Sequence, residues 1–207
     1  MTPLLTLLGF GGHAKVLIDI AKLNGLSINS LYDDDIRKQN KIYDSIAIKA
    51  PIDYNSPDNI IIAIGDNRIR KNISIKATKA HWTSIIHPSA IISKDVYIGE
   101  GTVIMAGVII QPGSTIGRHC IINTGACIDH DCFIEDFVHI APKAALAGGV
   151  MIGEGTIIGI GSSIVPNVTI GKWSTIGAGA AVICDIPDNC IAVGVPAHVK
   201  KIENEST

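Results

Sequence analysis

The strongest constraint on the fold is a six-residue repeat that runs from Ile86 to Val182. Every sixth residue in this stretch is Ile, Leu or Val, at seventeen successive positions without a break in phase. The residue four places later is mostly small or β-branched, as at Ala90, Cys120 and Ala144. A period of six fits neither an α-helix nor simple strand alternation. It is typical of hexapeptide repeats in a parallel β-helix, in which three hexapeptides make one triangular coil.

The repeat also predicts which side chains form the core of this β-helix. The aliphatic residue of each hexapeptide points inward and stacks on its equivalent in the next coil, and the small residue points inward near a corner. Hydrophobic residues make up 47% of the chain and aromatic residues only 4%, as a narrow stack of this kind requires. We expect the β-helix over residues 83–187, and a tail over residues 188–207 that closes its end.

Residues 1–82 have a different pattern, in which strands alternate with helices. The predicted strands cover residues 4–8, 28–32, 46–48 and 59–64. The predicted helices follow Gly12, with a stop near Gly25, and cover about residues 67–80. This alternation is typical of a small Rossmann-like parallel α/β sheet, about half of a doubly wound fold.

Three segments should meet at the carboxyl ends of these strands, where such folds bind ligands. They are Gly9 to Ala14, Asp33-Asp34, and Gly65-Asp66-Asn67. The first has the loose spacing of a dinucleotide fingerprint, and Asp33 or Asp34 lies near the position of a ribose-binding acid. Glycines and a helix N-terminus together favour phosphate. We expect a nucleoside diphosphate that carries a sugar; the alternative is a tight turn that binds nothing.

His130 is the candidate catalytic residue of the repeat region, because Asp129 and Asp131 flank it at or near a corner. One coil is eighteen residues, so Gly148 should lie beside His130 at the strand spacing of about 4.8 Å. A histidine can take a proton at neutral pH, and a neighbouring carboxylate can orient it. A bare glycine N–H can hold an oxyanion. These residue types suit acyl transfer, and the alternative is a solvated surface histidine.

Two further histidines of the repeat are weaker candidates. His139 should lie on the next face of the coil, and His119 is expected to be exposed. A zinc site built from the histidines of the repeat is an alternative that the spacing alone does not support.

Charge and composition exclude several other classes of function. The formal net charge of −2 does not favour nucleic acid or an anionic membrane as a partner. No apolar run approaches the roughly 18 residues of a membrane span, and the N-terminus does not resemble a signal peptide. The five cysteines are odd in number and unpatterned, so we expect a reduced, cytoplasmic protein. No cysteine stands beside a base, which favours direct transfer over an acyl-enzyme.

At the level of motifs, nearly the whole chain resembles a known family. The motifs are Gly9-Phe10-Gly11-Gly12-His13-Ala14, Tyr32-Asp33-Asp34, Ile62-Ala63-Ile64-Gly65-Asp66-Asn67, Ile86-His87-Pro88-Ser89-Ala90, Asn123-Thr124, Asp129-His130-Asp131, His139-Ile140-Ala141-Pro142 and Gly194-Val195-Pro196-Ala197. In this combination the sequence resembles bacterial sugar acetyltransferases that join a nucleotide-sugar-binding domain to a left-handed β-helix. The group includes N-acetyltransferases of UDP-4-amino sugars and relatives described as sialic acid O-acyltransferases.

The resemblance implies a role for particular residues. His130 matches the general base, Asp131 the acid that raises its basicity, and Gly148 a glycine whose N–H faces the thioester oxygen. Positions that match the acetyl-CoA site are His139, Gly148, Ile160 and Ala178. Positions that match the substrate site are Gly11, Gly12, His13, Asp33, Asp34, Gly65 and Asn123.

The resemblance also implies an activity. It predicts acetyl-CoA-dependent N-acetylation of a UDP- or dTDP-linked 4-amino-4,6-dideoxy sugar by a homotrimer, with no metal. O-acetylation of a sugar hydroxyl and a non-catalytic, nucleotide-binding trimeric scaffold are the alternatives.

Overall fold

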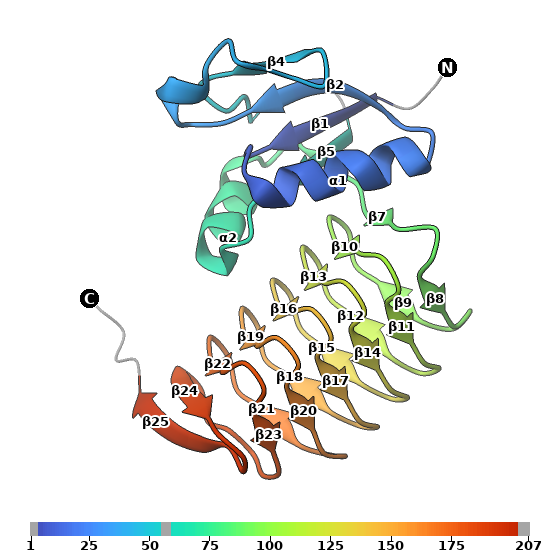
Figure 1. Ribbon diagram of the computed structural model, residues 1–207, viewed down its shortest axis with the longest axis vertical. Coiled ribbons are helices and arrows are strands. Elements are labelled where there is room, and N and C mark those ends of the chain that lie inside the picture. The colour runs from blue at the N-terminus through green and yellow to red at the C-terminus, as the bar shows by residue number, and fades with distance from the viewer. Residues whose placement is uncertain (1–3, 55–58, 203–207) are drawn as a thin grey trace. The chain divides into compact units, whose positions relative to one another are not determined.

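The chain forms two compact units, Met1–Pro88 and Ser89–Thr207. Figure 1 shows both in a computed structural model that describes residues 4–54 and 59–202. The first unit alternates strands and helices, and the second is a coil of short strands.

The first unit is built on a parallel sheet with helices α1 (Gly12–Leu23) and α2 (Asn67–Lys76). The sheet has the strand order β3-β4-β2-β1-β5-β6, and only the β3–β4 pair is antiparallel. Its strands are β1 (Leu4–Leu8), β2 (Ser27–Tyr32), β3 (Ile42–Tyr43), β4 (Ile46–Lys49), β5 (Asn59–Ile62) and β6 (His81–Trp82); a 3₁₀ turn, η1 (Ile36–Lys38), and β7 (Ile85–Ile86) complete the unit.

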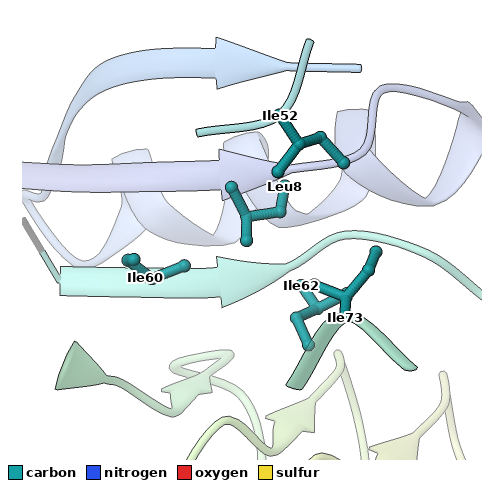
Figure 2. Close-up of a cluster of buried hydrophobic side chains, with 5 residues drawn as sticks. All are labelled: Leu8, Ile52, Ile60, Ile62 and Ile73. Atoms are coloured by element: carbon teal, nitrogen blue, oxygen red, sulfur yellow. The ribbon is translucent and has the colours of Figure 1, made fainter. Parts of the chain in front are cut away.

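The predicted α/β alternation is confirmed, with differences at the ends of elements. β5 and α2 end earlier than the sequence indicated, and β3 and β6 were not predicted because each has only two residues. A cluster of five buried aliphatic side chains packs around the ends of the central strands, as Figure 2 shows. The cluster consists of Leu8, Ile52, Ile60, Ile62 and Ile73. This core orders the strand ends that carry the glycine and aspartate motifs.

The second unit is a parallel β-helix whose coil strands have two residues each (Figure 1). One face has the strand order β8, β11, β14, β17, β20, β23, and another β9, β12, β15, β18, β21. The third contains β10, β13, β16, β19, β22, β24 and β25. The strands are β8 (Ile91–Ile92), β9 (Tyr97–Ile98), β10 (Val103–Ile104), β11 (Ile109–Ile110), β12 (Thr115–Ile116), β13 (Ile121–Ile122), β14 (Cys127–Ile128), β15 (Phe133–Ile134), β16 (His139–Ile140), β17 (Ala145–Leu146), β18 (Met151–Ile152), β19 (Ile157–Ile158), β20 (Ser163–Ile164), β21 (Thr169–Ile170), β22 (Thr175–Ile176), β23 (Ala181–Val182), β24 (Cys190–Val193) and β25 (His198–Ile202).

The inward column that the repeat predicts is present in the structure. From Ile104 to Val182 every sixth residue is buried, whereas Ile92 and Ile98 in the first coil are half-buried. The small residues between them, from Thr102 onward, are buried as well. Each buried aliphatic side chain contributes roughly 1.5–3 kcal/mol of transfer free energy, so this column is the main source of stability of the unit.

The expected tail is partly a sheet extension. β24 pairs in parallel with β22, and β25 folds back antiparallel on β24. Residues 203–207 of the tail lie outside the described residues.

The corners of the coil repeat every eighteen residues, and the last residue of each has a positive φ. Of the three lines of corners, one, here called the His130 corners, consists of residues 111–113, 129–131, 147–149 and 165–167. A second, the Asn123 corners, consists of residues 105–107, 123–125, 141–143, 159–161 and 177–179, and the third includes His119 and Phe137. Asp131 has φ 57° and Lys143 has φ 57°, between glycines in the neighbouring coils. The expectation that His119 is exposed was wrong: it is 4% exposed and stacks on Phe137, with ring centroids 5.2 Å apart.

Truncation of one inward residue tests the column. Ile134, which is fully buried, contacts equivalents in the coils on both sides. Ile134→Ala should lower the free energy of unfolding by about 2–5 kcal/mol, because it removes three carbons and leaves a cavity. The outward Thr169→Ala on the same sheet should cost about 0.5 kcal/mol or less. Denaturant unfolding measures both, and equal losses would contradict the assignment of Ile134 to the core.

Candidate active site

His130 is held at a corner that the backbone fixes on both sides. Asp129, which follows β14, donates its N–H to Leu146 O at 3.0 Å, and the N–H of Asp131 donates to Pro112 O at 3.0 Å. The Ser114 hydroxyl donates to Asp129 O at 2.7 Å. These bonds tie the corner to the coils before and after it. The side chain of His130 is 61% exposed, so a ligand can reach it.

A carboxylate fixes the tautomer of His130. Nδ1 lies 2.8 Å from Oδ2 of Asp131, and since an ionised carboxylate only accepts, Nδ1 carries the proton. Nε2 is then left with its lone pair. The hydrogen bond that His130 donates to Asp131, followed by the charge of Asp129, raises the pKa of His130 above its usual value. His130 therefore has the tautomer and the enhanced basicity of a general base.

Gly148 lies directly against the His130 ring, as the eighteen-residue coil predicts. A Cβ placed on Gly148 would lie 2.5 Å from Cε1 and 2.6 Å from Nε2 of His130. Gly149 N–H donates to His130 O at 2.9 Å, which fixes this register. The N–H of Gly148 itself has no acceptor among the residues that the structure describes. A buried amide donor thus lies next to the basic nitrogen, as an oxyanion site requires.

The side chain of His139, the first residue of β16, contacts Asn123, the first residue of one of the Asn123 corners. The Nδ2 of Asn123 is 3.1 Å from Nε2 of His139, and β13 and β16 place the two residues in neighbouring coils. Ile160, which is 59% exposed, and Ala178 follow along the same line of corners. The structure thus brings His139, Ile160 and Ala178 to one edge, and His130 with Gly148 to another.

A shallow groove of about 590 Å³ lies between these two edges, on the face of β11, β14, β17 and β20. Its floor is made of small outward side chains, among them Cys127, Ala145 and Ser163. Asp129, which precedes His130, lines one end. In each coil the chain runs from an Asn123 corner across this face to a His130 corner. The groove is lined on the side of the His130 corners by Gln111, Asp129, Ala147 and Val165. A narrow, extended ligand fits such a surface.

In the first unit, α1 begins with bare backbone. Gly11 is the N-cap and provides no side-chain cap, and a Cβ on Gly11 or Gly12 would meet no atom within 4 Å. The first-turn N–H groups are open to a ligand, and the helix dipole favours an anion there.

The two aspartates after β2 have different environments. The carboxylate of Asp33 accepts from Phe10 N at 2.7 Å, Asp35 N at 2.8 Å and Lys38 Nζ at 2.8 Å, and Asp33 is buried. It locks the turn before α1 to the end of β2, which leaves little capacity for a ligand. Asp34 is exposed and accepts one backbone N–H, from Ile52 at 3.0 Å. Asp34 is therefore the better ligand candidate of the pair.

His13 lies in the first turn of α1 and is largely buried, with no hydrogen-bond partner for Nε2. Burial, reinforced by the charge of Arg70, lowers the pKa of His13 to about 4, so it is neutral at physiological pH. Arg70 donates to the carbonyls of Ile64 and Gly65 at 3.1 and 3.2 Å. His13 and Gly65, which the sequence placed in one site, thus lie around a common buried guanidinium.

The sequence did not reveal a basic pocket of about 370 Å³ beside Gly11 and Gly12. Lys15, Lys38 and Lys41 line it, together with Phe10 and Tyr43, whose ring centroids are 5.0 Å apart. Lys15 comes from α1, whereas Lys38 and Lys41 come from a turn-rich segment after β2 that has no periodicity to show where its side chains gather.

Residues 4–54 and 59–202 contain no group of three or more His, Cys, Asp or Glu side chains that could hold a metal ion. They also contain no helix that is long and apolar enough to cross a membrane.

Family models match both units. The model of the PglD N-terminal domain matches residues 5–77, and that of the bacterial transferase hexapeptide repeat matches residues 95–130 and 149–184. A GDP-perosamine N-acetyltransferase of Escherichia coli O157:H7 is 34% identical over 147 residues, which cover 68% of this chain and 66% of the relative. The chain thus spans just under two thirds of this relative's length.

Solved structures resemble the whole chain. A variant of the perosamine N-acetyltransferase of Caulobacter crescentus, in complex with CoA and GDP-perosamine, is 37% identical with a TM-score of 0.87, covering 95% of this chain and 96% of that one. The acetyltransferase domain of PglB from Neisseria gonorrhoeae, in complex with acetyl coenzyme A, is 35% identical with a TM-score of 0.87, covering 97% and 100%. The chain belongs to the family of hexapeptide-repeat sugar N-acetyltransferases that carry a PglD-type N-terminal domain, and its second unit is their left-handed β-helix.

The raised pKa of His130 predicts the pH dependence of the transfer rate. A base acts only when Nε2 is unprotonated, so kcat/KM should rise with pH through a midpoint above the ordinary histidine pKa of about 6.5. Asp131→Asn removes the main cause of the shift, so the midpoint should move to lower pH. The control is His81→Ala, which removes an exposed histidine of β6 and should leave the midpoint unchanged. An unmoved midpoint in Asp131→Asn would contradict the pairing.

Proposed function

We propose that this protein transfers the acetyl group of acetyl-CoA to the amine of a nucleotide-linked 4-amino-4,6-dideoxy sugar. The observation that carries the proposal is the arrangement of His130, Asp131 and Gly148 at one corner of the coil. It provides a base and an unpaired amide donor side by side. The solved relatives that bind CoA together with GDP-perosamine support the same class of substrates.

The reaction proceeds by direct attack of the amine on the thioester carbonyl. Nε2 of His130 takes a proton from the attacking nitrogen, while Asp131 stabilises the imidazolium through Nδ1. The N–H of Gly148 donates a hydrogen bond to the negatively charged tetrahedral oxygen. The C–S bond then breaks, and CoA leaves as the thiolate, which takes from the imidazolium the proton that His130 removed from the amine.

The groove beside β14 and β17 is the proposed path of the pantetheine arm. Its floor of Cys127, Ala145 and Ser163 leaves room for an extended chain, and one end reaches Asp129. Ile160 and Ala178 are not among the residues that line the groove; they lie at the Asn123 corners, from which the same face begins, and are proposed to contact the arm there. The thioester would then lie within reach of His130.

The first unit is proposed to bind the nucleotide diphosphate. Gly11 and Gly12 offer open N–H groups, and the basic pocket of Lys15 and Lys41 adds positive charge. Asp34, with a free carboxylate oxygen, is the candidate partner of a ribose hydroxyl, and His13 and Gly65 complete the set. Asp33 would act indirectly, because its carboxylate holds the turn.

We also propose a homotrimer. Tyr97, Phe133 and Met151 are outward, exposed by 61%, 48% and 48%, and lie in one column on the face of β9, β12, β15 and β18, with Thr115 between Tyr97 and Phe133. Exposed large apolar side chains grouped in this way are typical of a covered surface. Val103 and Ile121, whose places in the repeat are also outward, are buried within the single chain and are not part of this surface. The free cysteines of the described residues suit the reducing cytoplasm, which we propose as the location.

The test is thiol release from acetyl-CoA, with GDP-, UDP- and dTDP-linked 4-amino-4,6-dideoxy sugars and free sialic acid as acceptors. We expect turnover with one nucleotide amino sugar, lowered by about 10² or more in His130→Ala because a general base is lost. Binding of that nucleotide sugar, measured by calorimetry, should survive in the variant.

The other outcomes have distinct meanings. Turnover with sialic acid alone would replace N-acetylation by O-acetylation. Nucleotide binding without turnover on any acceptor would favour the scaffold. Full activity of His130→Ala would overturn the assignment of the base.

A further inference from the structure

A fixed amide determines the protonation of His139. Asn123 N–H donates to Ile140 O at 2.9 Å, so the backbone of Asn123 is held in place. The N–H of Thr124 donates to Oδ1 of Asn123 at 2.8 Å. Because a backbone N–H can only donate, the atom that faces it is the amide oxygen, and the NH₂ group is the one that faces His139.

The orientation of the amide leaves one choice for the imidazole. Nδ2 of Asn123 only donates, and it lies 3.1 Å from Nε2 of His139. Nε2 must therefore accept, which means that it carries no proton. A neutral imidazole has one N–H, so the proton is on Nδ1. An imidazolium would place two N–H groups against each other.

The two histidines thus have partners of opposite character. His130 faces the carboxylate of Asp131 through Nδ1, which favours the charged ring and leaves Nε2 open to a proton. His139 faces an amide donor through Nε2, which occupies the lone pair that a base would use. We propose that Asn123 is a positioning residue that holds His139 neutral with its proton on Nδ1, so that His139 serves the transfer as a hydrogen-bond donor and His130 alone takes the proton.

The role of His139 in acetyl transfer rests on the proposed function. The protonation state of His139, by contrast, can be measured without turnover. In the full-length protein labelled with ¹⁵N-histidine, long-range ¹⁵N–¹H correlations report which ring nitrogen is protonated, and His139→Gln assigns the signals. We expect His139 to show a protonated Nδ1 and an unprotonated Nε2 over the whole pH range in which His130 titrates. A protonated Nε2, or an imidazolium in that range, would overturn the proposal.

A variant of the partner tests the cause. Asn123→Asp places an acceptor where the donor was, so His139 should move its proton to Nε2 or become charged, and its NMR signals should switch accordingly. The matched control is Asn72→Asp, an exposed position on α2 with the same change in charge, and it should leave His139 unchanged. If Asn123 only supported the fold, the Asn123→Asp substitution would leave the protonation of the His139 ring nitrogens unchanged.

The kinetic consequence separates the two histidines. Asn123→Asp should lower kcat about tenfold or more, because the donor is lost from its position. The midpoint of the acidic limb of kcat/KM should stay where it is, because it belongs to His130. A midpoint that moves in Asn123→Asp would make His139 the base and overturn the proposal. Absence of turnover in wild type would count against the proposed function only, and the NMR result would still decide the tautomer.

Discussion

The hydrogen-bond ladder between successive coils is the interaction on which the second unit depends. Bonds such as Asp129 N–H to Leu146 O and Gly149 N–H to His130 O fix each residue beside the one eighteen places later. The inward stack of aliphatic residues has the same period, so a slip of one residue would turn core side chains to water. Because both constraints have the same period, residues eighteen positions apart in the sequence, such as His130 and Gly148, lie side by side.

Much of the fold could therefore be predicted from sequence. The six-residue period located the buried column from Ile104 to Val182, and the glycine motifs located the start of α1. The contact between His130 and Gly148 followed from the length of one coil. The ends of helices and strands were less predictable. The helical sequence pattern continues past Lys76, where α2 ends, because periodicity does not show where the C-cap forms.

Side-chain partners were the part that sequence could not provide. Asp33 and Asp34 are identical neighbours, yet one is a buried acceptor of three bonds and the other is exposed. Their difference depends on Lys38 and Phe10, which no periodicity connects to them. His119 was expected in water but stacks on Phe137, because a residue at a left-handed corner lies over the coil beside it. The orientation of the Asn123 amide likewise depends on one backbone N–H.

The proposed role of His130 depends on the bare backbone of Gly148 beside its ring, and the substitution Gly148→Ala changes that backbone alone. A methyl group in Gly148→Ala would lie within about 2.6 Å of the His130 ring, so the ring must leave its position. The measurement is the rate of acetyl transfer at saturating substrates, with nucleotide affinity and thermal unfolding as controls. We expect a fall in kcat of about 10² or more with nucleotide affinity retained. Wild-type kcat in this variant would overturn the proposed pairing of His130 with Gly148.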